Sequence, residues 1–286
     1  MTWFQDYGRH DLPWRESASA YEVLVSEFML QQTTVATIIP RFRAWMKLFP
    51  TIEALANALE QEVLSAWQGL GYYARARRLH AVAKIIVIQY NGKIPSNLAL
   101  LLQLPGIGAY TAAALQAFAF DQSVAVLDTN IFRVIARLNN ITDPIDTLAG
   151  RKCIEEEMIS LLPKKGGRDF AAALMDLGSI ICIAGKPNCP KCPLANLCEA
   201  EEPSTLPRKK PKVATTKKTE ARAFYQRGEF IYLEHSSGPL WKGLWILPMS
   251  PLIKRRQDVI ISIVYPITRY RVTMNIYKPL GAVPKN

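Results

Sequence analysis

The feature that most constrains the fold of this chain is a group of four closely spaced cysteines. Cys182, Cys189, Cys192 and Cys198 follow the spacing C-x6-C-x2-C-x5-C, and prolines in the same segment oppose helix formation. Four thiolates in one loop can ligate either a cubane iron–sulfur cluster or a tetrahedral zinc ion. Zinc ribbons usually pair two C-x2-C knuckles, and a single such pair occurs here, so the spacing favours an iron–sulfur cluster.

The composition is that of a folded protein with a surplus of basic residues. Hydrophobic residues make up 49% and charged residues 21% of the 286 residues, which argues against a disordered chain. The formal net charge of +11 favours a polyanionic partner, either nucleic acid or an anionic membrane surface. The N-terminal sequence does not resemble a secretory signal, and no apolar run is long enough to span a bilayer. We therefore expect a cytoplasmic protein whose cysteines are metal ligands rather than disulfides.

The chain divides into three segments by its sequence pattern. Up to about residue 200 apolar residues recur at helical spacing, which predicts a mainly α region. The two clearest stripes are Leu55, Leu59, Val63 and Trp67, and Phe170, Leu174, Leu177 and Ile181. Residues 201–220 are rich in proline and basic residues and indicate a linker, for which a solvated tether and direct DNA contact are equally open. Residues 221–286 contain strand-like runs at 229–234, 259–264 and 271–277, which predict a small, β-rich C-terminal domain.

A glycine-containing turn separates two expected helices, 97–103 and 109–118. Gly106 and Gly108 permit a tight turn whose exposed amides, at the start of the second helix, form a phosphate site. A plain helix–helix turn is the alternative, and the motif alone would favour it. Beside the cysteine group, DNA contact becomes the preferred interpretation.

A second glycine turn, Gly69-Leu70-Gly71, leads into Tyr72 and a segment with three arginines, of which Arg75 is the first. Aromatic and guanidinium groups together suit base stacking and phosphate neutralisation. A basic helix face with packed tyrosines is an equally good interpretation of the same residues.

Taken together, these motifs resemble the MutY adenine glycosylase family of the helix–hairpin–helix superfamily, which also includes endonuclease III. The resemblance covers residues 1 to about 200 and rests on seven motifs in family order. They are LPWR (12–15), SEFMLQQT (26–33), GLGYYARARRL (69–79), LPGIGAYTA (104–112), VLDTN (126–130), MDLG (175–178) and the four cysteines. The resemblance implies a six-helix module and a second module with a 4Fe–4S cluster bound by Cys182, Cys189, Cys192 and Cys198. It implies a substrate cleft between the modules.

The resemblance also implies roles for individual residues. Glu27 matches the catalytic acid, and Asp128 matches the carboxylate that stabilises the sugar cation. Further active-site and DNA-contacting positions match Tyr110, Asn130, Arg15, Asp176, Gln32 and Tyr72. The implied reaction is excision of adenine mispaired with 8-oxoguanine or guanine in double-stranded DNA, by base flipping. The enzyme is expected to be a monomer that acts at the nucleoid.

The two carboxylates suit this chemistry. Cleavage of an N-glycosidic bond requires protonation of the leaving base and stabilisation of an oxocarbenium-like sugar. Glu27 lies in an apolar helical stretch, where desolvation favours its protonated form. Asp128 must be ionised to stabilise positive charge. Without the resemblance, an exposed helical glutamate and an ordinary N-cap are the favoured interpretations, and at Asp128 capping and catalysis can coexist.

Tyr110 bears on the type of glycosylase. Endonuclease III-type lyases carry a nucleophilic lysine at this position, and no lysine occurs between Asn97 and Phe132. Because tyrosine cannot form a Schiff base, we expect little strand cleavage.

The sequence departs from the family pattern at two places. Thr129 replaces a usual glycine beside Asp128, so the backbone there must avoid positive φ. The C-terminal part begins like a Nudix-type domain, which implies a small C-terminal α+β domain, and it is much shorter than usual. Its loop for oxidised guanine corresponds to 267–269, where Thr268 preserves a hydroxyl but the usual histidine and aromatic residue are absent. We expect a weakened preference for oxidised guanine.

Two other functions compete with adenine excision. An endonuclease III-like enzyme would act on oxidised pyrimidines, and Tyr110 opposes it. A metal-stabilised DNA-binding module, with zinc as a weaker variant, would recognise mispairs without cutting.

Overall fold

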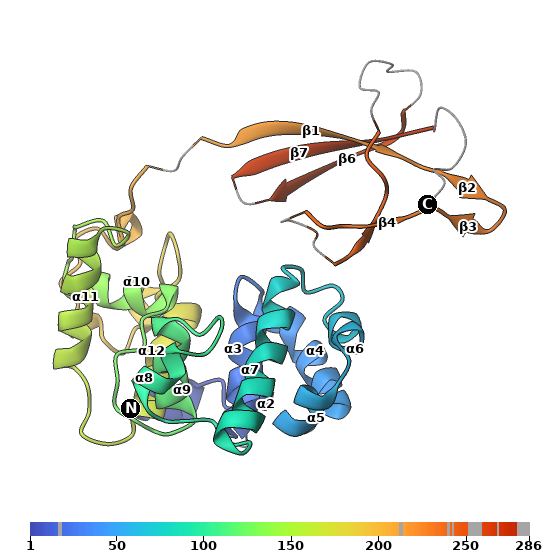
Figure 1. The fold of residues 1–286 in the computed structure, drawn as a ribbon. Coiled ribbons are helices and arrows are strands. Elements are labelled where there is room, and N and C mark those ends of the chain that lie inside the picture. The colour runs from blue at the N-terminus through green and yellow to red at the C-terminus, as the bar shows by residue number, and fades with distance from the viewer. Residues whose placement is uncertain are drawn as a thin grey trace. The chain divides into compact units, whose positions relative to one another are not determined.

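The structure is a computed structural model that describes residues 1–16, 19–211, 214–238, 241, 243–250, 259–267 and 269–278. The chain forms two compact units, Met1–Lys210 and Pro211–Asn286. The first unit is helical and the second is built of strands in its described part (Figure 1). No helix of the described residues combines the length and apolarity needed to cross a bilayer.

The helices of the first unit form two groups, each around its own core (Figure 1). The first group surrounds α7, and the second is built from α9, α10, α11 and α12. The helices are α1 (Thr2–Tyr7), α2 (Pro13–Glu16), α3 (Ala20–Leu30), α4 (Val35–Leu48), α5 (Ile52–Asn57), α6 (Glu60–Ala66), α7 (Ala74–Tyr90), α8 (Leu98–Leu102), α9 (Ala109–Phe118), α10 (Thr129–Leu138), α11 (Leu148–Ser160) and α12 (Gly167–Ile180). The expected mainly α region is confirmed.

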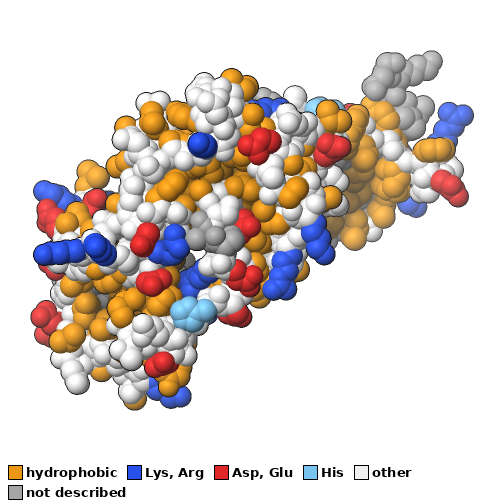
Figure 2. Space-filling view, turned by 90° about the horizontal axis from the view of Figure 1, so that it is seen from below, with side chains coloured by type: hydrophobic (Ala, Val, Ile, Leu, Met, Phe, Trp, Pro, Cys, Tyr) orange, Lys and Arg blue, Asp and Glu red, His pale blue; other side chains and the backbone are white. Residues whose placement is uncertain are grey.

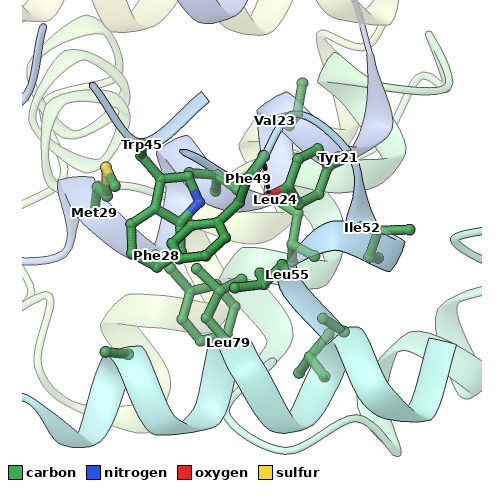
Figure 3. Packing of buried hydrophobic residues seen from close by; sticks show 14 of the residues in the cluster. Tyr21, Val23, Leu24, Phe28, Met29, Trp45, Phe49, Ile52, Leu55 and Leu79 are labelled. Atoms are coloured by element: carbon green, nitrogen blue, oxygen red, sulfur yellow. Dashed lines mark hydrogen bonds between the residues drawn. The ribbon is translucent and has the colours of Figure 1, made fainter. Parts of the chain in front are cut away.

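Aromatic side chains fill the core of the first group. The ring of Trp45 packs edge-on against Phe49 and Trp67, with ring centroids 4.9 and 5.5 Å apart. Figure 3 shows Phe28 of α3, Leu55 of α5 and other apolar residues gathered around Trp45 and Phe49. Because these side chains are almost fully removed from water, α3 is held rigidly on the first group.

One of the two predicted apolar stripes does not lie on a single helix. The segment from Leu55 to Trp67 is broken into α5 and α6, and Leu59 is an exposed N-cap residue between them. The carboxylate of Glu62 accepts a hydrogen bond from the Leu59 amide at 2.8 Å, which stabilises the start of α6. The second stripe lies on α12 and packs into the second core, as expected.

The hairpin expected at Gly106 is present between α8 and α9. Gly106 has a φ of +83°, and a Cβ there would lie 2.7 Å from the Cδ of Arg78. Both the backbone conformation and the space therefore require glycine. The Asn97 side chain caps α8 by accepting a hydrogen bond from the Leu100 amide at 3.2 Å.

The described residues of the second unit form one three-stranded sheet and two short two-stranded sheets. In the larger sheet β7 (Tyr270–Tyr277) lies between β1 (Thr216–Ala223), which runs parallel to it, and β6 (Val259–Ile267), which runs antiparallel. The short pairs are β2 (Gln226–Arg227) with β3 (Phe230–Ile231), and β4 (Glu234–His235) with β5 (Trp245–Ile246). The described residues of this unit form no helix, so the helical part of the expected α+β fold is not seen in them.

The structure corrects the expected linker over 201–220. Residues up to Lys210 belong to the first unit, where Leu206 is buried and the carbonyl of Arg208 accepts a hydrogen bond from the Ile145 amide. From Thr216 the chain is already in β1. The basic residues concealed both features, because a strand can carry lysines on its exposed positions.

Candidate active site

A cavity of about 610 Å³ lies where the two helical groups of the first unit meet. Its lining includes residues of α3, α9, α10 and α12 together with the segment that precedes α3. The polar residues that converge on it from the expected site are Arg15, Glu27, Gln32, Tyr110, Asp128 and Asn130. Residues far apart in sequence are thus brought to one cavity, as the expected cleft between two modules requires.

Glu27 lies on α3, a helix that is buried on several sides, and its side chain is only 6% exposed. Burial raises the pKa of Glu27 to about 7, a hydrogen bond from Tyr110 opposes this shift, and the nearby charge of Asp128 adds to it. The expected desolvation of this carboxyl group is confirmed. A carboxylic acid with this pKa holds a proton in much of the population at neutral pH and can donate it.

Tyr110 is on α9, next to the hairpin, and it faces the same two carboxylates. Burial raises the pKa of Tyr110 well above its ordinary value, and the charges of Glu27 and Asp128 raise it further. The phenol therefore stays protonated and acts as a hydrogen-bond donor toward Glu27.

Asp128 is the N-cap of α10. Its carboxylate accepts hydrogen bonds from the amide of Ile131 at 2.7 Å and from the side-chain amide of Asn130 at 2.8 Å. Capping at this residue was expected and is confirmed. Thr129 begins the helix and is not among the residues with positive φ, so the bulkier residue fits the local backbone.

Asn130 is fixed in turn by Arg133, one turn further along α10. The Arg133 guanidinium donates to the Oδ1 of Asn130 at 2.8 Å, and also to the carbonyls of Gly178 and Cys182. Gly178 matters here, because a Cβ on it would lie 2.7 Å from the Cβ of Asn130.

Asp176 lies outside the cavity lining, so it is not positioned to contact a base directly. It is fully buried, does not line the cavity, and binds Arg15 at 2.8 Å and Arg9 at 2.6 Å. Burial raises the pKa of Asp176, but the two guanidinium groups outweigh this effect and hold it below its ordinary value. Arg9 and Arg15 both line the cavity, so Asp176 orients them. Arg9 was missed, because an isolated arginine near the N-terminus carries no signal in one sequence.

Gln32 and Tyr72 lie on two neighbouring turns of the first helical group. Both have positive φ, +61° and +46°, which non-glycine residues seldom adopt. Gln32 lines the cavity, and the side chain of Tyr72 is 54% exposed.

The structure corrects the expectation that Arg75 contacts phosphate. Arg75 is only 6% exposed, and its guanidinium is bound to backbone carbonyls of the protein itself. The arginine-rich motif gave no indication of this, because burial is decided by segments distant in sequence.

The hairpin glycines differ in what surrounds them. Gly106 packs against Arg78, whereas a Cβ at Gly108 would meet no atom within 4 Å. Gly108 is the N-cap of α9 and supplies no side-chain cap, so the first amides of α9 are available to an anion.

On the face shown in Figure 2, basic side chains are interspersed with acidic and apolar ones. Thr268 lies outside the described residues.

Two of the four cysteines contact Arg137, a buried arginine of α10. Arg137 donates to the Sγ of Cys182 at 3.3 Å, and the Sγ of Cys198 donates to the Arg137 carbonyl at 3.4 Å. Burial raises the pKa of Cys192, and the other three thiols add to this effect, so the four are neighbours. Among the described residues, no group of three or more His, Cys, Asp or Glu side chains is arranged so that it could hold a metal ion. The chemistry of the donor set, four soft sulfur atoms next to a buried cation, still fits a thiolate-bound cluster.

Comparison with known proteins identifies the class. Residues 25–159 match the family model of the HhH-GPD superfamily of base excision DNA repair proteins. The first unit resembles a thermostable thymine-DNA glycosylase (TM-score 0.63, 31% identity, covering 68% of this chain and 90% of that one). It also resembles endonuclease III in a non-covalent DNA complex (TM-score 0.59, 25% identity, covering 69% and 89%). Fold and sequence thus define a base excision DNA repair protein of the HhH-GPD superfamily.

Curated relatives narrow this assignment. The adenine DNA glycosylase of Buchnera aphidicola subsp. Baizongia pistaciae is 35% identical over 253 residues, which cover 87% of this chain and 72% of that protein. That of Mycolicibacterium smegmatis is 44% identical over 197 residues, covering 68% and 66%. The human enzyme is 40% identical over 214 residues, covering 71% of this chain and 38% of its own length. The chain belongs to the adenine DNA glycosylase family. It spans only part of the length of these relatives.

Proposed function

We propose that this protein excises adenine mispaired with 8-oxoguanine or guanine from double-stranded DNA, acting as a monofunctional glycosylase and as a monomer. The observation that carries the proposal is the pair Glu27 and Asp128 in one cavity, with the pKa of Glu27 raised to about 7. Two carboxyl groups in different environments are what acid-catalysed cleavage of a glycosidic bond requires.

In the proposed reaction, Glu27 donates its proton to N7 of the flipped adenine. The C1′–N9 bond then breaks with its electron pair leaving on the base, and the sugar becomes an oxocarbenium ion. Asp128 stabilises this cation by its negative charge. Water adds to C1′ and its proton passes to the Glu27 carboxylate, which restores the acid and gives free adenine and an abasic site.

The other cavity residues position the substrate. Tyr110 donates to Glu27, and Asn130 holds Asp128. Arg15, held by Asp176, would face the base. Removal of adenine from the stack leaves a gap in the duplex, which Gln32 and Tyr72 would fill. The amides that follow Gly106 and Gly108 would hold the phosphate backbone without reading sequence.

Two further parts of the proposal concern the metal site and the second unit. Cys182, Cys189, Cys192 and Cys198 would hold a 4Fe–4S cluster, which supplies structural support to the loop between α12 and residue 200 when bound. The second unit would be a Nudix-like domain in which Thr268 contacts oxidised guanine, with a weakened preference for that base.

The test is single-turnover base release from four otherwise identical duplexes, with alkali treatment to reveal abasic sites. They carry adenine opposite 8-oxoguanine, guanine or thymine, and thymine glycol opposite adenine. Release from the first two supports the proposal, and their rate ratio measures the preference for the oxidised base. Release from thymine glycol alone would assign an endonuclease III-like activity, and release from none would favour a binding module.

Strand cleavage is tested in the same assay without alkali. Because Tyr110 replaces a lysine nucleophile, borohydride should trap little enzyme on DNA. Appreciable trapping would contradict the monofunctional assignment.

A further inference from the structure

Arg75, at the start of α7, is a buried cation without an acidic partner. No ion pair among the described residues includes Arg75, although its side chain is almost entirely removed from water. A buried charge is costly unless it is compensated. The compensation here comes from backbone carbonyls and from the rings of Trp67 and Tyr72, which lie 5.3 and 5.8 Å from its guanidinium carbon.

The two terminal nitrogens of Arg75 serve two different segments. Nη1 donates to the carbonyls of Phe28, Met29 and Gln31 at 2.9, 3.0 and 2.6 Å. Nη2 donates to the carbonyl of Leu70 at 2.9 Å. Longer contacts run from Nη2 to Thr33 Oγ1 at 3.4 Å and to the Gly71 carbonyl at 3.5 Å.

The segment bound by Nη1 explains why a cation is stable at this position. Phe28 and Met29 are in the last turn of α3, where carbonyl groups have no partner within the helix. The negative end of the helix dipole is also located there. An arginine at this point satisfies these carbonyls and needs no carboxylate.

Both segments continue directly into a residue with left-handed backbone. Gln32 follows Gln31, and Tyr72 follows Gly71, so each strained residue comes immediately after a carbonyl that Arg75 contacts. Non-glycine residues remain in this region only where surrounding contacts determine the backbone. Arg75 supplies such contacts at both places, and its guanidinium also lies over the ring of Tyr72.

We propose that Arg75 is a positioning residue that joins the Gln32 and Tyr72 turns into one rigid pair, which enters the duplex when adenine leaves the stack. This inference rests on the proposed adenine excision and deepens it. A lysine keeps the charge but has one nitrogen, which cannot bind both turns in the planar geometry of a guanidinium.

The experiment compares Arg75→Lys with Arg151→Lys, the same change at an exposed position of α11. Enzyme concentrations are set by active-site titration, so unfolded material does not count. Stopped-flow fluorescence follows unstacking of 2-aminopurine placed opposite 8-oxoguanine, and single-turnover assays follow release of adenine. We expect Arg75→Lys to slow both steps about 10- to 100-fold, and Arg151→Lys to leave both unchanged. Equal rates in the Arg75 variant and the wild type would overturn the inference.

A double-mutant cycle separates positioning from a general structural role. In a Gln32→Ala, Tyr72→Ala background, Arg75→Lys should change the rate of release less than about twofold, because the residues through which it acts are gone. Additive losses would overturn the inference. The dependence of the rate on pH should keep its midpoint, since Glu27 is untouched, and a shifted midpoint would assign Arg75 to the acid instead.

The experiments distinguish a failure of the proposed function from a failure of the inference about Arg75. A wild-type protein that releases no adenine from any duplex removes the function, and with it this inference. A wild-type protein that is active and matched by Arg75→Lys removes the inference alone.

Discussion

The carboxylate of Asp128 accepts a hydrogen bond from the amide of Ile131 at 2.7 Å, so one side chain both begins α10 and faces the cavity. The first amides of a helix carry partial positive charge, which favours an anion at that point. Helix capping and the proposed chemistry therefore use the same negative charge.

Two substitutions at Asp128 should separate these roles. Asparagine caps helices about as well as aspartate, so Asp128→Asn should change the free energy of unfolding by less than about 0.5 kcal/mol while slowing base release at least ~100-fold. Asp128→Ala should lose the same activity and about 1 kcal/mol of stability as well. Chemical denaturation and single-turnover assays measure the two quantities. Equal stability of both variants would contradict the capping role.

The raised pKa of Glu27 predicts a pH dependence of activity. The acid must be protonated to act, so the rate of base release should fall as pH rises through about 7. Glu27→Gln should abolish release and keep DNA binding. A rate that stays constant from pH 6 to pH 9 would show that another group supplies the proton.

Glu27 should also lower stability at alkaline pH. Its folded pKa lies above the unfolded value, so its contribution to stability is complete below about pH 4.5 and is lost as pH rises through about 7. Glu27→Gln does not ionise, and it should be more stable than the wild type at pH 8, by up to about 3 kcal/mol. Denaturant titrations at pH 5 and pH 8 test this expectation. A difference in stability between Glu27→Gln and the wild type that is the same at both pH values would contradict it.

Gly106 and Gly108 should respond differently to alanine. Gly106→Ala places a Cβ 2.7 Å from Arg78 Cδ in a left-handed backbone conformation, so the hairpin must distort, at a cost of roughly 1–2 kcal/mol. We expect the affinity for an uncleaved duplex to fall about tenfold, which is the same free energy expressed as binding. Gly108→Ala meets no protein atom and has ordinary φ, so it should leave the hairpin undistorted, and it is the matched control for the free energy of unfolding. Filter binding at one salt concentration compares the two variants.

His80 should make the first helical group sensitive to acid. It is buried on α7, and burial lowers its pKa, with the charge of Lys84 adding to the effect. The unfolded state thus takes up a proton more readily than the folded state. Stability is complete above about pH 6.5 and declines as pH falls below it. Between pH 7 and pH 5, the melting temperature of His80→Gln should therefore fall less than that of the wild type. Parallel curves for the two proteins would exclude it.

Local signals in the sequence predicted much of the site. The apolar stretch around Glu27, the capping position of Asp128 and the glycine turn at 104–108 each depend on neighbours within a few residues. Propensities and periodicity report such neighbours directly. The spacing of the cysteines is local in the same sense.

Features that depend on distant segments could not be predicted in this way. Arg75 became a buried cation because the end of α3 packs on α7, and Arg9 reached the cavity through a buried aspartate of α12. The break at Leu59 was hidden by a periodicity that continues across two helices. The early start of β1 at Thr216 was hidden by its lysines, which face water from a paired strand.

The contact between Asp176 and the arginines at positions 9 and 15 has a consequence for synthesis of the protein. One wall of the cavity includes Arg9 and Arg15, and the carboxylate that orients them is translated more than 160 residues later. A ribosome-bound chain that ends before α12 has both arginines but no anion to hold them. A chain that ends between α10 and α12 therefore contains Glu27 and Asp128 but lacks the carboxylate that orients Arg9 and Arg15.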